Sequence, residues 1–207
     1  MKMFDSLISN AIGLPKHVQA FLQEGKVLLP TVLLQSVAKR SLADSDMKLL
    51  EWKCTDKAFL LKLDLSRVQS PVRISEAEVA IEVVTVKLDS QQQTIIMRPK
   101  LLSATGDGVL SKVVLWVAKV FLQTLVQALL EKSLTVQTSQ SVVKVQPCDD
   151  GMKVDLSELP EMRALLDLRP IPFINRGIFD VIHICGGSHT ESGFAVHGKM
   201  SASGPKT

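Results

Sequence analysis

The sequence predicts an α+β fold, in which a long, bent antiparallel sheet wraps around one long apolar helix and short helices precede the sheet. Three observations predict this class. Apolar residues recur with a helical period up to about residue 42, alternate with polar residues over much of 47–102, and dominate 109–132. A chain of 207 residues is long enough to bury one core. We expect a single domain over 1–200, followed by a disordered tail over 201–207.

The first forty residues contain three helical patterns. In 4–12, apolar residues recur every three or four positions, which is typical of an amphipathic helix. A second short helix fits 16–23. Pro30 suits the first turn of a third helix, which reaches about Ser41, because the missing N–H is not needed there. We expect its buried side to comprise Leu29, Val32, Leu33 and Val37.

From about residue 47 the apolar period changes from 3.6 to two. The stretch 57–66 places four apolar side chains on one face and polar ones on the other, which indicates a half-buried antiparallel strand. In 79–88 the alternation slips by one residue at 83/84, and this slip predicts a β-bulge in a long, bent strand. A further strand covers 94–102, where Pro99 moves its end towards a sheet edge.

Strands are expected again after the long helix. Alternating residues indicate strands over 134–145, and the Asp-Gly pair in 147–151 indicates a hairpin turn. A short helix fits 158–167. The final pattern is a hairpin of two strands, 178–185 and 194–200, with a glycine-rich connection between them.

The stretch 109–132 is the most apolar part of the chain. On a helical wheel, Lys112, Lys119, Gln123 and Gln127 fall within one arc of about 80°, and nearly all the remaining circumference is apolar. Such a helix needs cover on more than one side, which a curved sheet or a second copy of the chain would supply. Its two lysines leave an uncharged run of only 11 residues, which excludes a membrane span.

The order of elements resembles the tubular lipid-binding (TULIP) fold, in which a curved sheet wraps a long helix around an apolar cavity. The segment Lys153-Val154-Asp155-Leu156-Ser157, with Leu159-Pro160 after it and the later strand 180–184, is similar to bacterial lipid-binding and uncharacterised proteins of that architecture. The resemblance extends over about 47–200. It implies an apolar cavity between sheet and helix.

The function that we expect is non-enzymatic binding of a lipid or another apolar ligand in a cavity between the curved sheet and the long helix. Sites of this kind are mostly apolar, with few polar groups. Trp116 matters most, because it lies inside the polar arc, where a large ring needs a partner or a ligand. The candidate lining residues all lie on the long helix: Val113, Trp116, Val117, Phe121 and Leu125.

The alternative function is that of a structural or interaction protein, which buries the apolar helix against a partner or in a homodimer. A filled core would use the same residues.

A metal-dependent enzyme is the least favoured interpretation. Such an enzyme would use residues of the final hairpin as metal ligands. A simple pairing of the two strands, however, places His197 on the opposite face from His183. We therefore expect a hairpin with exposed histidines and a buried thiol at Cys185. We therefore predict no catalytic residue, no metal ligand and no cofactor. The polar residues of that hairpin are His183, Cys185, His189, Glu191 and His197.

Charge and cysteine content bear on partners and compartment. The net charge of +3 is spread along the chain and there is no Tyr, which argues against nucleic-acid binding. The pattern in 4–12, with Lys2 and Lys16 beside it, suits peripheral contact with an anionic membrane, although packing against the end of the sheet explains it more simply. Three widely spaced cysteines and an N-terminus without a signal pattern predict a cytoplasmic protein.

Overall fold

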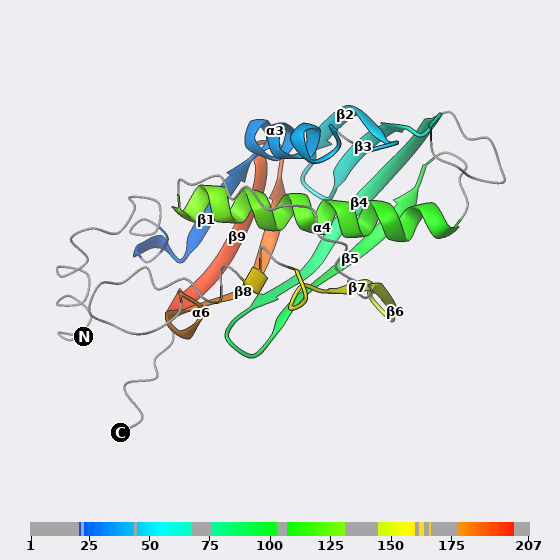
Figure 1. Cartoon of the computed structure of the whole chain (residues 1–207). Helices are drawn as coiled ribbons and strands as arrows, with labels where there is room; N and C mark the ends of the chain where they lie inside the picture. Colours follow the sequence, from blue (N-terminus) through cyan, green and yellow to red (C-terminus); the bar gives the residue numbers. More distant parts are fainter. Residues whose placement is uncertain are drawn as a thin grey trace, which may run out of the picture.

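The computed structural model describes residues 21, 23–43, 45–67, 76–102, 107–130, 145–159, 162–163, 166 and 178–200. Its strands form one open, nine-stranded antiparallel sheet, and two helices lie along one face of this sheet (Figure 1). The α+β class is thus confirmed in its broad form. The helices are α3 (Thr31–Ser41), α4 (Asp107–Leu130) and the short α6 (Ile178–Val181). The strands are β1 (Lys26–Pro30), β2 (Lys48–Cys54), β3 (Phe59–Asp64), β4 (Glu76–Leu88), β5 (Gln93–Leu101), β6 (Val145–Cys148), β7 (Gly151–Asp155), β8 (Ile182–Thr190) and β9 (Gly193–Met200).

The sheet forks at β4, its longest strand. The main path runs β1-β9-β8-β4-β5-β7-β6, and β3 with β2 branches from it at β4. One edge of β4 pairs with β5 from Val79 to Leu88. The other edge pairs with β3 as far as Ile81 and with β8 only at Leu88. Two strands therefore share one edge of β4 and diverge between these positions.

The predicted bulge in β4 is confirmed. The register of β4 against β5 shifts between Val83 and Thr85. Side chains before the shift, such as Ile81 and Val83, and after it, such as Val86 and Leu88, are all buried. The extra residue thus keeps the apolar side chains of both halves on the covered face of the sheet.

The helix α3 starts one residue later than expected. Pro30 closes β1 and occupies the N-cap position with φ −66° and ψ 146°, an extended conformation. The buried residues of α3 are Leu34, Val37 and Ala38. The expectation that Val32 is buried is wrong, because its side chain is 78% exposed in the first turn.

Three other expectations are wrong. The first four residues of the predicted strand 178–185 form the short helix α6 instead, and β8 begins at Ile182. The sequence pattern assigns no strand to 26–30, yet β1 pairs with β9 along all five residues. The glycine-rich segment after Cys185, expected to be a loop, instead continues β8 to Thr190. The hairpin then turns within two residues, and Gly193 follows at φ 151°, where a Cβ atom would overlap the carbonyl oxygen of Leu29.

Other predicted segments lie outside the described residues, namely the helix over 4–12, all but the last residue of the strands over 134–145, and the tail over 201–207. Of the predicted helices over 16–23 and 158–167, the structure describes only some residues. Among the helices of the described part, none is both long and apolar enough to cross a membrane.

Candidate functional site

The predicted lining residues of α4 all point into the interior of the protein. Trp116 is 7% exposed, and the other four are at most 1% exposed. Val113, Val117, Phe121 and Leu125 are spaced four residues apart and therefore form one stripe along the helix. The stripe meets residues of the sheet, since the ring of Phe121 packs edge-on against Phe194 of β9 at a centroid distance of 5.4 Å.

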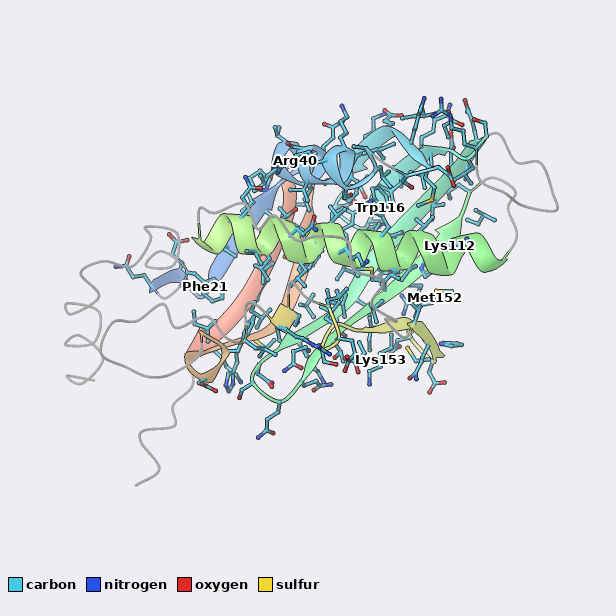
Figure 2. All side chains as sticks on the ribbon, in the orientation of Figure 1. Phe21, Arg40, Lys112, Trp116, Met152 and Lys153 are labelled. Carbon is cyan, nitrogen blue, oxygen red and sulfur yellow. The ribbon has the colours of Figure 1, made fainter. Side chains whose placement is uncertain are left out.

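The partner that Trp116 needs comes from its own chain. The Trp116 Nε1 atom donates a hydrogen bond of 2.7 Å to the hydroxyl oxygen of Ser41, at the end of α3. Its ring also stands edge-on to Trp52 of β2, at a centroid distance of 5.9 Å. Figure 2 shows Trp116 between α3 and α4. The helix α3 therefore covers part of the arc of α4 that the sequence marks as polar.

Six aromatic side chains form a continuous layer between α4 and the sheet. Neighbouring ring centroids are 4.6 to 5.9 Å apart, and most contacts are tilted or edge-on, as aromatic pairs prefer. The layer begins and ends on α4 and crosses β2, β3, β8 and β9 in between. We call it the aromatic layer, and its members are Trp116, Trp52, Phe59, His189, Phe194 and Phe121.

His189 occupies the fork of the sheet. The backbone N–H of Val83, on the edge of β4 between β3 and β8, donates a hydrogen bond of 2.9 Å to His189 Nε2. Because Nε2 accepts, the neutral ring carries its proton on Nδ1. Burial lowers the pKa of His189 from 6.5 to about 4, and the nearby Glu82 carboxylate only partly opposes this shift. The imidazole is therefore neutral at physiological pH and replaces a strand partner for Val83.

Two N–H donors in the aromatic layer are unused. Trp52 Nε1 and His189 Nδ1 are buried and have no hydrogen-bond partner among the described residues. They belong to the rings on either side of Phe59, whose centroid is 5.2 Å from Trp52 and 4.6 Å from His189. A buried donor without an acceptor costs about 1–3 kcal/mol, and native proteins contain few of them. The layer is thus apolar and holds two donors that an acceptor could use.

A separate pocket lies at the end of β8 and β9, beside the chain that leads into β1. Its volume is about 300 Å³, at the lower end of the range for small-molecule sites. Phe21 and Ile182 are its buried apolar walls, and Lys199 is a charged group at its rim. None of the predicted lining residues of α4 contributes to it. The residues that line it are Phe21, Gln23, Glu24, Gly25, Ile182, Gly198 and Lys199.

The final hairpin separates its polar residues onto two faces. A register shift between Ile184 and Gly186 places His183 opposite Lys199 and His197 opposite Gly186, on the face away from the helices. His197 Nε2 lies 3.0 Å from the hydroxyl oxygen of Ser188 on that face. The described residues include no group of three or more His, Cys, Asp or Glu that could hold a metal ion.

Three features of this hairpin differ from the sequence analysis. His183 and His197, expected on opposite faces, lie on the same face, because the register shift displaces one strand by a residue. Cys185, expected to be a buried thiol, is exposed, because it lies at the register shift. His189 lies on the inner face beside Phe194, with a ring-centroid distance of 4.9 Å. Its role at the fork could not be recognised, since it depends on where β3 and β8 leave β4.

Comparison of the chain with protein-family models, with curated proteins and with solved structures gives no match. The function must therefore be argued from the arrangement of the side chains.

Proposed function

We propose that the protein binds a lipid or another apolar ligand, without catalysis, in the aromatic layer between the sheet and α4. The observation that carries the proposal is the pair of unused donors, Trp52 Nε1 and His189 Nδ1, in otherwise apolar surroundings. A ligand with an apolar body and one acceptor group, such as the carboxylate or ester oxygen of an acyl chain, matches this chemistry.

In this proposal the sheet bends around α4, as in the tubular lipid-binding proteins that the sequence resembles. The ligand enters beside the stripe of α4 that contains Val117 and Phe121, and the ring of Phe59 turns aside to admit it. Trp116, which packs on Trp52, would then report the arrival of the ligand through its fluorescence.

Two matched tryptophan substitutions test this site. Trp52→Phe removes an N–H without a partner and keeps an aromatic ring in place, whereas Trp116→Phe removes an N–H that Ser41 already accepts. With palmitate as the probe, we expect Trp52→Phe to weaken binding by about tenfold, since a hydrogen bond to a charged group contributes about 1.5–3 kcal/mol. Trp116→Phe should leave the affinity almost unchanged. Isothermal titration calorimetry measures both.

Other results would contradict the proposed site. Equal palmitate affinity in the wild type and in Trp52→Phe would show that Trp52 does not receive the ligand. Lys199→Glu, at the rim of the separate pocket, should have no more effect than Lys100→Glu on β5. A selective loss in Lys199→Glu would move the site to that pocket and refute the aromatic layer as the site.

The second candidate function is self-association. Among the apolar side chains of α4 between Lys112 and Ala128, only Leu115 and Ala128 are partly exposed, which leaves little in this stretch for a second copy to cover. A different feature favours a dimer: β1 is an edge strand of the sheet, and Leu28 on it is 43% exposed. Size-exclusion chromatography with light scattering tests this function, because a dimer that Leu28→Lys dissociates would support it and a monomer would reject it.

A further inference from the structure

The two helices that cover the sheet carry all of the net charge of the protein. α3 contains Lys39 and Arg40, and α4 contains Lys112, Lys119 and one carboxylate, Asp107. Together they have a formal charge of +3, which equals that of the whole chain. The rest of the chain is balanced, with 20 basic and 20 acidic residues.

The four basic side chains lie on the outward surface of the helical layer. Lys39, Arg40 and Lys112 are exposed, and Lys119 is partly exposed. Arg40 donates a hydrogen bond of 3.1 Å to the Oε1 atom of Gln127, which joins the charged end of α3 to the polar arc of α4. Figure 2 shows Arg40 and Lys112 on these two neighbouring helices. Lys112 and Lys119 are about 10 Å apart along α4.

The opposite face of the sheet differs in its electrostatics. There Lys62 pairs with Glu76 at 2.9 Å, and Arg98 pairs with Glu82 at 2.8 Å. None of the ion pairs within the described ranges includes one of the four basic residues of the helical layer. Among the described residues, no ion pair therefore neutralises the four basic side chains of the helical layer, whereas the cations of the far face are partly neutralised.

We propose that the outward face of α3 and α4 docks on an anionic membrane surface through Lys39, Arg40, Lys112 and Lys119. Negatively charged lipid headgroups complement this face, and each Lys or Arg near such a surface contributes to binding. Val32, 78% exposed in the first turn of α3, gives the same layer an apolar side chain for the headgroup region.

Nucleic acid fits this surface less well than lipid does. All the Phe and Trp side chains of the described residues are at most 7% exposed, so that no Phe or Trp ring in this part of the chain is available to stack on a base. The membrane proposal is independent of the proposed ligand site, because none of the four basic residues belongs to the aromatic layer. Either proposal can therefore fail while the other stands.

Vesicle flotation with matched double substitutions tests the docking surface. The test variant is Lys112→Gln with Lys119→Gln, and the control is Lys87→Gln with Lys100→Gln, two exposed lysines on β4 and β5. Both variants lose two charges. On vesicles of phosphatidylcholine mixed with phosphatidylglycerol, we expect the test variant to bind about 30-fold more weakly than the wild type, from about fivefold per charge. The control should bind within about twofold, because its charges lie beyond the screening length from the membrane.

Each remaining outcome overturns the proposal. Equal losses in both variants would show that total charge matters and the helical face does not. Equal binding of the wild type to phosphatidylcholine alone would show that the headgroup charge is irrelevant. Tighter binding to single-stranded DNA than to the vesicles, lost in the Lys112/Lys119 variant, would assign the face to nucleic acid. Circular dichroism of both variants checks that the fold is intact, as expected for exposed lysines.

Discussion

Acidification should destabilise the fold through His189 before most carboxylates are protonated. In the folded protein the pKa of His189 is about 4, because burial disfavours the charged ring, whereas in the unfolded chain it is near 6.5. Between these values the unfolded state binds more protons than the folded state, so stability falls as the pH decreases from about 6.5 to about 4. Above this range the ring is neutral in both states, and the hydrogen bond that it accepts from the N–H of Val83 stabilises the folded protein in full.

The size of the effect follows from the shift. A lowering of about 2.5 pKa units corresponds to at most about 3 kcal/mol. Because the ring is partly exposed, solvent screening reduces this value, and we expect a loss of about 1–2 kcal/mol. This is a substantial fraction of the stability of an ordinary domain.

Urea unfolding at a series of pH values, followed by circular dichroism, measures the effect. The comparison is His189→Gln, whose amide oxygen can still accept from Val83 but does not titrate. The exposed carboxyls of Glu51 and Asp64, whose pKa values are lowered by Lys53 and Ser66 respectively, titrate in both proteins and cancel in the difference. The wild type should lose stability between about pH 6.5 and 4 more steeply than the variant. Parallel pH profiles would refute the assignment of a neutral, buried His189 at the fork.

Four further substitutions test the packing beneath α4. Gly187→Ala should cost about 1–3 kcal/mol in urea unfolding, because a Cβ atom there would overlap the ring of Phe194, and a neutral result would contradict this close contact. Trp52→Phe should cost about 1 kcal/mol less than Trp116→Phe, because both substitutions shorten a buried ring but only Trp116→Phe loses a hydrogen bond, the one to α3; equal costs would contradict the unused donor of Trp52. Phe121→Ala should cost about 3–5 kcal/mol by chemical denaturation, and a loss below about 1 kcal/mol would mean that the ring is not part of a packed core.

The sheet was predictable wherever its strands have one buried and one exposed face. The alternation in 57–66 identified β3 and its buried side chains, Phe59, Leu61 and Leu63. The phase slip identified the bulge after Val83, because apolar residues on both sides of the slip can share one face only if an extra residue is inserted between them. Local sequence is sufficient for such features, since each depends only on near neighbours.

Other elements depend on contacts that sequence spacing does not reveal. β1 is five residues long and ends in a proline, so its pattern is too short to distinguish a strand from a helical start. The stretch after Cys185 looks like a loop because it contains Gly186 and Gly187. In the structure the second glycine is needed within a strand, where the ring of Phe194 covers it.

In the candidate site, too, some features could be predicted from the sequence and others could not. The wheel of α4 identified Trp116 as a ring that needs a partner, and the structure supplies Ser41 and Trp52. The unused donors of Trp52 and His189 could not be found from sequence, because a missing hydrogen bond is a property of the packed interior. Both residues come from strands far apart in the chain, β2 and β8, which meet only through β3 and β4.

The most direct test of the ligand proposal is native mass spectrometry of the wild type and of Trp52→Phe, each incubated with palmitate. The account predicts a complex of one palmitate per wild-type chain, extractable into organic solvent, and a markedly lower occupancy in Trp52→Phe at the same concentration. A wild-type protein that stays at its bare mass, or equal occupancy in both proteins, would contradict the assignment of the aromatic layer as the binding site.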